Sequence, residues 1–301
     1  MPLLVLLAVF GFVAQLVDGS LGMGYGVTST TMLVGVGVAP AAASASVHFA
    51  QIGTTLASGI SHAKMGNTDW RTVSILAVPG FVGAFCGAVF LVSLDAELAK
   101  LLVATLLLLL GGYVLFRFLV LGGGRPRLKE RNSPFFLVPM GLFGGTLDSI
   151  GGGGWGPVGT TTLLSSGRLE PRKVVGSVST TEFVVAVGGS LGFLFAMHSE
   201  AIPWRFTAAL LVGGVLAAPI AAYLVRHMAP RVLGVAAGGL IIFTNSRTLA
   251  IWAGASGAAQ AWLLGAVAAV WVGLLVWVVR RERAVRRSPA AAVEVRELVD
   301  A

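Results

Sequence analysis

The sequence contains one cysteine, Cys86, among 301 residues. A single thiol cannot form a disulfide or a cysteine-based metal cluster within the chain, so both are excluded as internal features. Charged residues are also scarce, at 11% of the chain against 56% hydrophobic residues. In a soluble protein about 25% of the residues are charged. This shortage of charge indicates a protein of the lipid bilayer.

The residue patterns of common enzyme sites are missing as well. The sequence shows no cluster of metal ligands, and no nucleophile and base at a recognisable spacing. The glycine run at 151–156 follows an apolar segment that we predict to be helical, and it lacks the Lys-Ser/Thr pair of a phosphate-binding loop. We therefore expect a protein that is not an enzyme, with no catalytic residues, no metal site and no cofactor.

Long apolar runs are present instead. A helix needs about 20 apolar residues to cross a bilayer of about 30 Å, and runs of this length occupy residues 73–94, 98–121, 206–225 and 259–279. They lack the period-two alternation of a membrane β-barrel. No Lys or Arg precedes the first apolar run, so we expect a retained membrane segment and no cleaved signal peptide. The sequence predicts an all-α polytopic membrane protein.

The net charge is +8, and the positive residues gather at 117–131 and 280–287, at expected helix ends and in short loops. A basic chain can bind nucleic acid, but clusters in this position are typical of the cytoplasmic loops of membrane proteins. We therefore expect no nucleic-acid partner. The C-terminus should be cytoplasmic.

One passage of the chain occurs twice. The stretch DGSLGMGYG at 18–26 returns as DSIGGGGWG at 148–156, and two threonines follow each copy at the same distance. The copies pair Asp18 with Asp148, Gly22 with Gly152, Gly24 with Gly154, Tyr25 with Trp155, Gly26 with Gly156, and Thr30 and Thr31 with Thr160 and Thr161. Each copy interrupts an apolar stretch with glycines beside one carboxylate. In a membrane protein, a repeated broken helix points to a transport site.

A polar stretch at 122–133 divides the chain into two halves. We predict a first repeat at 1–121, a basic cytoplasmic linker at 122–133, a second repeat at 134–250, an additional transmembrane helix at 259–280 and a basic cytoplasmic tail at 281–301. Beyond the glycines the correspondence continues, with Pro40 opposite Pro171, Ser46 opposite Ser177, His48 opposite Ser179, and Gln51 opposite Glu182.

The distribution of basic loops bears on how the halves are oriented. Each half should contain a glycine-broken helix pair, re-entrant or half-length, followed by about three spanning helices. If the broken pair forms a hairpin, or if both of its segments span, the number of crossings is odd and the second half is inverted. Most basic loops then fall on one side of the membrane, whereas a four-crossing half would scatter them. We therefore predict two inverted-topology repeats.

The glycine breaks suit an anion. A helix that begins in mid-membrane at Gly24 or Gly154 presents unpaired N–H groups and the positive end of its dipole. The competing interpretation is close helix packing, which we prefer for isolated glycines such as Gly83 and Gly87. The threonines and His48 can contact the anion or bond within and between helices. The predicted substrate-binding residues are Gly22, Gly24, Tyr25, Gly26, Thr30, Thr31, His48, Gly152, Gly154, Trp155, Gly156, Thr160 and Thr161.

Three acidic residues lie within apolar segments, where an ionisable group usually faces a cavity or a partner. Asp18 and Asp148 can carry protons or cap the following helix. Glu182 is harder to explain as a cap, and its counterpart Gln51 is neutral. We predict Asp18, Asp148 and Glu182 as proton-coupling residues.

These motifs resemble the TauE/SafE family of membrane proteins. The resemblance rests on Asp-x-x-x-Gly-Met-Gly-Tyr-Gly at 18–26, SASVH at 44–48, SGISH at 58–62, GNTDW at 66–70 and the second glycine-rich copy. It covers the chain to about Arg247. It implies a multi-pass secondary transporter of the bacterial inner membrane that exports sulfite or a sulfur-containing organic anion such as a sulfonate.

We therefore expect a small anionic substrate and the lipid bilayer as partners, and a homodimer is compatible with the sequence. Transport would proceed by alternating access around the two glycine segments. The alternative is an anion-selective channel, which would use the same half-helix dipoles without ion coupling.

Overall fold

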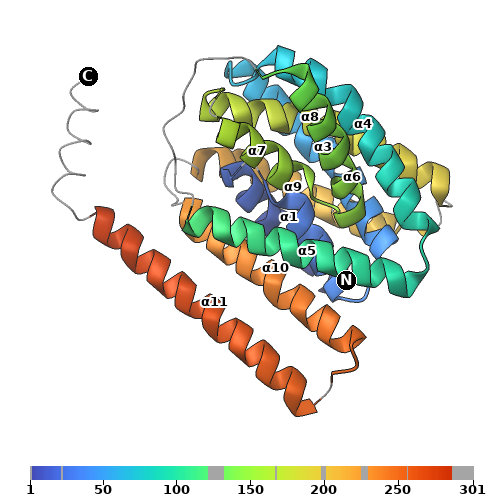
Figure 1. Cartoon of the computed structure of the whole chain (residues 1–301), viewed down its shortest axis with the longest axis vertical. Coiled ribbons are helices and arrows are strands. Elements are labelled where there is room, and N and C mark those ends of the chain that lie inside the picture. The colour runs from blue at the N-terminus through green and yellow to red at the C-terminus, as the bar shows by residue number, and fades with distance from the viewer. Residues whose placement is uncertain are drawn as a thin grey trace.

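The computed structural model describes residues 2–21, 23–120, 132–166, 168–197, 201–224, 230–255 and 257–286. Within these residues the chain forms eleven α-helices and no strand, as Figure 1 shows. The helices are α1 (Pro2–Leu21), α2 (Tyr25–Gly35), α3 (Pro40–Lys64), α4 (Trp70–Ser93), α5 (Ala96–Leu119), α6 (Pro134–Gly151), α7 (Trp155–Ser166), α8 (Pro171–Ala196), α9 (Trp204–Leu224), α10 (Pro230–Trp252) and α11 (Gly257–Arg286).

Each half begins with a helix pair that is broken at the glycines, as the sequence predicts. In the first half, α2 has 11 residues and follows Gly24, whose φ is +124°. In the second half, α7 has 12 residues, and α6 ends at Gly152 with a φ of +70°. Residues with a side chain rarely adopt such positive φ values, so the breaks require glycine at these two positions.

The long helices begin at proline or at acidic caps. Proline opens α3, α6 and α8, where its missing N–H costs no hydrogen bond. Asp69 accepts a hydrogen bond from Thr72 N at 2.8 Å at the start of α4. Asp95 accepts one from Leu98 N at 2.9 Å at the start of α5. These caps satisfy N–H groups that would otherwise be unpaired.

Glycines let two pairs of helices approach closely. α4 packs against α6, and α1 packs against α9. A Cβ added to Gly87 of α4 would lie 2.6 Å from the carbonyl oxygen of Thr146 in α6, and Gly83 faces the backbone of Leu142 in the same way. In the other pair, Gly11 faces the backbone of Leu210. The packing interpretation of Gly83 and Gly87 is therefore confirmed.

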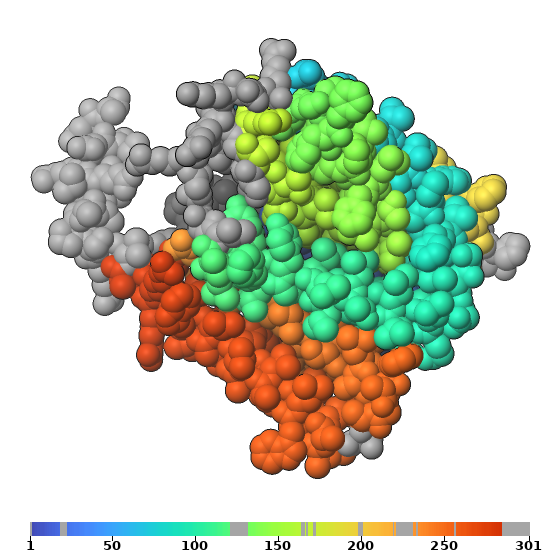
Figure 2. All heavy atoms as spheres, viewed as in Figure 1, coloured from blue at the N-terminus to red at the C-terminus, as the bar shows by residue number. Residues whose placement is uncertain are grey.

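One flank of the molecule consists of α5, α10 and α11, which run side by side in Figure 1. α11 packs against α10, and Figure 2 shows it at the outer edge. Many of its apolar side chains are exposed, for example Trp262 at 80%, as expected of a helix that faces lipid. α11 continues beyond the predicted boundary at residue 280 as far as Arg286. Residues 122–131 of the predicted linker and the tail from residue 287 lie outside the described residues.

Five helical segments in the described part are long and apolar enough to cross a membrane: Trp70–Ser93, Ala96–Leu119, Lys173–Ala196, Gly234–Trp252 and Gly257–Ala284. α3, with 25 residues, carries the buried polar side chains of Ser44, Ser46, His48 and Gln51 instead. It packs against α8 and α9. These four polar residues of α3 thus lie inside the protein, shielded from lipid.

Candidate functional site

The two glycine breaks meet in the interior. A Cβ added to Gly26, in the first turn of α2, would lie 2.6 Å from Cα of Gly153. One added to Gly153 would lie 2.7 Å from Cα of Val27. Gly152 faces Thr30 at a similarly short distance. The structure therefore brings the predicted residues Gly26, Thr30 and Gly152 together: the backbone of Gly26 lies against that of Gly152 and Gly153, and Gly152 faces the side chain of Thr30. Gly22 lies outside the described residues.

Both aspartates cap the half-helix that follows their break. Asp18 Oδ1 accepts a hydrogen bond from Tyr25 N at 3.3 Å, and Asp148 Oδ1 accepts one from Trp155 N at 2.8 Å. The capping alternative is thus confirmed for one oxygen of each carboxylate. Since the cap spans the break from the preceding helix, each aspartate also joins the two members of its helix pair.

The remaining oxygen of Asp148 faces His48. His48 Nε2 lies 3.2 Å from Asp148 Oδ2 and 3.3 Å from Ser149 Oγ. The other ring nitrogen, Nδ1, lies 2.9 Å from the carbonyl oxygen of Ser44. A carbonyl only accepts, so Nδ1 carries a proton. Nε2 therefore faces both Oδ2 of Asp148 and the Ser149 hydroxyl, and its contact with Oδ2 is an ion pair when the ring is protonated.

The His48–Asp148 pair links the halves, because His48 belongs to α3 and Asp148 to α6. Both side chains are buried. Ser44 reinforces the link by donating a hydrogen bond to the carbonyl oxygen of Ser149 at 2.5 Å. Ser179 stands at the position that corresponds to His48 in the second half. The repeat therefore supplies no second imidazole for Asp18.

A second buried pair joins the halves where α3 meets α8. Gln51 Nε2 donates a hydrogen bond to Glu182 Oε1 at 3.0 Å. Both residues are buried, and a buried carboxyl group needs such a partner. Gln51 and Glu182 occupy corresponding positions in the sequence, so two equivalent positions of the halves contact each other directly.

The aromatic residues of the motifs point into helix interfaces. Tyr25 Oη donates a hydrogen bond to the carbonyl oxygen of Leu210 in α9 at 3.1 Å. Trp155 Nε1 donates one to the carbonyl oxygen of Val178 in α8 at 3.1 Å. Both side chains are 1% exposed. In this conformation they anchor the half-helices to the surrounding long helices.

The threonines differ between the copies. Thr31 Oγ1 accepts a hydrogen bond from Asn245 Nδ2 of α10 at 3.1 Å. Thr161 donates to the carbonyl oxygen of Pro157 one turn earlier in α7. Thr160 is buried. The buried hydroxyl of Thr30 has no hydrogen-bond partner among the described residues.

Two further features concern the starts of the half-helices. Gly154 and Gly156 flank Trp155, and Gly154 accepts the first helical hydrogen bond of α7, from Val158 N at 3.0 Å. Gly24 does the same for Thr28 N in α2, also at 3.0 Å. Because residue 157 is proline, α7 offers one N–H group fewer at its start than α2.

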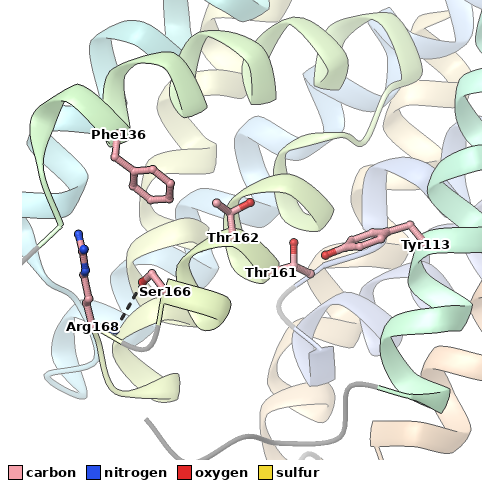
Figure 3. Close-up of a pocket in the computed structure, with 6 residues that line it drawn as sticks. All are labelled: Tyr113, Phe136, Thr161, Thr162, Ser166 and Arg168. Carbon is pink, nitrogen blue, oxygen red and sulfur yellow. Dashed lines mark hydrogen bonds between the residues drawn. The ribbon is translucent and has the colours of Figure 1, made fainter. Parts of the chain in front are cut away.

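A cavity of about 570 Å³ lies beside the far end of α7. Its lining comes from α5, α6 and α7 and from Arg168, which lies shortly after the end of α7, as Figure 3 shows. The lining residues are Tyr113, Phe136, Thr161, Thr162, Ser166 and Arg168. Only Thr161 among them was predicted as a site residue. The others carry no sequence signal, because the cavity depends on how three helices are arranged.

Comparison with known proteins agrees with these features. Residues 7–248 match the family model described as "Sulfite exporter TauE/SafE". Over 284 residues the chain is 46% identical to the Bacillus subtilis (strain 168) protein named "Probable membrane transporter protein YtnM". The aligned region covers 93% of this chain and 94% of that protein. No solved structure matches the chain. The chain therefore belongs to the TauE/SafE family and is a membrane transporter.

Proposed function

We propose that the protein is a secondary transporter that exports a small sulfur-containing anion, such as sulfite or an organosulfonate, across the cell membrane by alternating access. The observation that carries this proposal is the meeting of the two glycine breaks, each with a half-helix that begins in the protein interior. Half-helix N-termini near the middle of the membrane are the usual anion sites of transporters with repeated broken helices.

The contacts between helices support an architecture of two repeats related by a pseudo-twofold axis. If α1 to α5 correspond to α6 to α10, then the α4–α6 contact corresponds to α1–α9, and α2–α3 corresponds to α7–α8. The α3–α8 and α5–α10 contacts join corresponding helices, as expected beside a pseudo-twofold axis. Trp155 abuts Gly80 of α4, and Tyr25 abuts Gly214 of α9 in the same manner.

The basic residues favour the inverted arrangement over a parallel one. Lys64 and Arg71 lie at the junction of α3 and α4, and Arg168 lies between α7 and α8. An inverted second half places these residues and the C-terminal end of α11 on one side, which the positive-inside rule assigns to the cytoplasm.

The substrate would bind between the two breaks. In the structure the first turn of α2 is covered by Gly152 and Gly153, so the breaks must separate before an anion reaches the N–H groups. Thr30 is buried beside Gly152, and its hydroxyl would donate to the anion. Alternating access then consists of movements that part the breaks toward one side of the membrane at a time.

Proton coupling would use the asymmetric pairs. His48 lies within ion-pair distance of Asp148, and Glu182 is a buried carboxyl group that accepts a hydrogen bond from the neutral Gln51. Both pairs join α3 to the second half. Their protonation therefore changes the attraction between the halves, which is the property that a coupling group needs.

The test is uptake of radiolabelled sulfite into proteoliposomes, with and without an imposed pH gradient. We expect gradient-dependent flux that is lost in the Glu182→Gln variant. The matched control is Glu97→Gln, because Glu97 is an exposed acid at a helix start, and this variant should retain the flux. Voltage-driven flux that ignores the pH gradient would identify a channel instead. Absence of flux in sealed wild-type vesicles would overturn sulfite as the substrate.

A further inference from the structure

We infer that the groove between α5, α10 and α11 binds one acyl chain of an anionic phospholipid, and that the phosphate of this lipid lies at Arg281 near the end of α11. The inference goes beyond the proposed function, because the ligand is a bound lipid and not the transported anion. The three helices run side by side along one flank of the molecule, as Figure 1 shows.

The groove is apolar. It has a volume of about 260 Å³, and its walls include Leu115 of α5, Ile242 of α10 and Val270 of α11. Among the lining residues that the structure describes, the only polar side-chain atom is Nε1 of Trp271. This atom already donates a hydrogen bond to the carbonyl oxygen of Val235 at 3.2 Å. The groove therefore offers hydrocarbon contacts and suits a ligand without polar groups.

Trp271 holds α11 against α10. Its indole ring lies directly against Gly239, where a Cβ would collide with it, and its ring centroid is 6.3 Å from that of Phe243. Both of these residues belong to α10. The groove remains on the side of α11 that faces Leu115 of α5.

The volume of the groove decides between two apolar occupants. A helix is about 10 Å across and rises about 5.4 Å per turn, so that a single turn takes up roughly 420 Å³. A groove of about 260 Å³ is too small to enclose a helix of a second copy of the chain. An acyl chain is thinner than a helix, and the bilayer supplies it at the exposed surface of α11, where Val270 is 63% exposed.

A line of residues connects the groove to the basic end of α11. Val267, Leu274 and Arg281 follow one another at intervals of seven residues, so they lie on one face of the helix. Val267 and Leu274 line the groove. The line from Val267 to Arg281 is about 21 Å long, which exceeds the depth of about 15 Å of one hydrocarbon leaflet. A lipid with its phosphate at Arg281 can therefore reach the groove with its acyl chain.

Trp277 lies between the groove and the arginine. The guanidinium carbon of Arg281 is 5.3 Å from the ring centroid of Trp277, and this contact holds the face of the guanidinium group. The N–H groups at its edge stay available for a phosphate. Tryptophan is also the residue that membrane proteins place at the level of the lipid headgroups.

The charges at this end favour an anionic lipid. Arg280, Arg281 and Arg283 are exposed. The acid among them, Glu282, accepts a hydrogen bond from Arg231 of α10 at 3.4 Å. Within the part of the chain that the structure describes, no carboxylate pairs with the three exposed arginines. Arginine clusters beside a membrane helix attract anionic headgroups.

The experiment titrates phosphatidylglycerol and phosphatidylcholine of equal chain length onto the purified full chain and counts bound lipids by native mass spectrometry. We expect the wild type to hold one phosphatidylglycerol about tenfold more tightly than one phosphatidylcholine. Arg281→Gln should abolish this preference, because a charge-assisted hydrogen bond is lost, and Arg281→Lys should restore part of it. The matched control is Arg283→Gln, which removes the same charge from another face of α11 and should keep the preference.

A second pair of variants tests the groove. Ala266 lines it, so Ala266→Phe should fill part of the space and weaken the binding of both lipids about tenfold. Ala269→Phe adds the same ring at a residue of α11 outside the lining and should bind as the wild type does. Both alanines are exposed, so neither ring is forced into the protein core.

Several outcomes would overturn the inference. Equal affinity of the wild type for the two lipids would remove the anionic headgroup. Equal effects of Arg281→Gln and Arg283→Gln would leave only a diffuse attraction by the basic helix end, and equal binding by the two phenylalanine variants would remove the groove. Dimers that persist without lipid and disappear in Ala266→Phe would assign the groove to a second copy of the chain.

Discussion

At the scale of single residues, the two aspartates of the motifs have the same cap and different neighbours. Asp18 and Asp148 each accept a hydrogen bond from the first N–H group of a half-helix, whereas His48 contacts Asp148. Replacement by asparagine keeps an oxygen for the cap and removes the charge. We expect Asp148→Asn to lower gradient-driven flux about tenfold or more, and Asp18→Asn to retain it.

The two variants serve as controls for each other, because their effects on the cap are alike. Thermal unfolding in detergent should show similar midpoints for both. Alanine at either position should lower the free energy of unfolding by about 1 kcal/mol more than asparagine does, because alanine cannot cap the helix. Equal loss of proton coupling in both asparagine variants would show that coupling does not depend on the contact between Asp148 and His48.

The aromatic residues of the motifs offer a second residue-scale prediction. Tyr25→Phe and Trp155→Phe each remove one hydrogen bond to a helix carbonyl and leave an aromatic ring in place. We expect Tyr25→Phe to lose about 1 kcal/mol of stability and Trp155→Phe to lose more, because the smaller ring also leaves a cavity. Both variants should keep their apparent affinity for the transported anion. A rise in the apparent KM with unchanged unfolding would instead identify the side chain as a substrate ligand.

At the scale of helices, the α4–α6 contact depends on the absence of side chains. A Cβ on Gly145 would lie 2.9 Å from Ala84 N, and closer still to Gly80. Gly145→Ala should therefore separate the helices and cost about 1–3 kcal/mol. Gly112→Ala is the matched control, because nothing lies within 4 Å of a Cβ there. It should be neutral or stabilising, since alanine favours the helix. Similar unfolding midpoints for both variants would contradict close packing.

The helices were largely predictable because their signals are local. Glycine clusters and the flanking aspartates predicted both breaks, and the short helices that follow the breaks are 11 and 12 residues long. Proline at 40 and 171 opens corresponding helices. α11 continues past residue 280 to Arg286, because arginines follow its apolar run without any helix-breaking residue before Arg286.

At the scale of the whole molecule, the sequence predicted the two glycine breaks but not which of the candidate residues are in contact. The repeat register places His48 opposite Ser179, yet its contact is Asp148, 100 residues away in the other half. The roles of Tyr25 and Trp155 depend on α9 and α8 in the same way. The cavity at Arg168 is lined by residues from three helices, α5, α6 and α7. Local patterns contain no information on such long-range contacts.

The orientation of the halves can be tested with one matched pair of cysteines. Met65 follows α3, and Ala201 precedes α9; both are exposed, and they lie in corresponding loops. In a Cys86→Ser background, Met65→Cys and Ala201→Cys each provide one thiol for a membrane-impermeant maleimide. Inverted repeats place the two loops on opposite sides, so intact cells should show labelling at 201 and protection at 65.

Permeabilised cells provide the control, because both thiols should then react. Parallel repeats would place both loops on one side, and the two variants would behave alike in intact cells. Labelling at 65 with protection at 201 would keep the inversion but reverse the orientation. In that case the cavity beside α7 would open to the outside, and the structure would represent the outward-facing state.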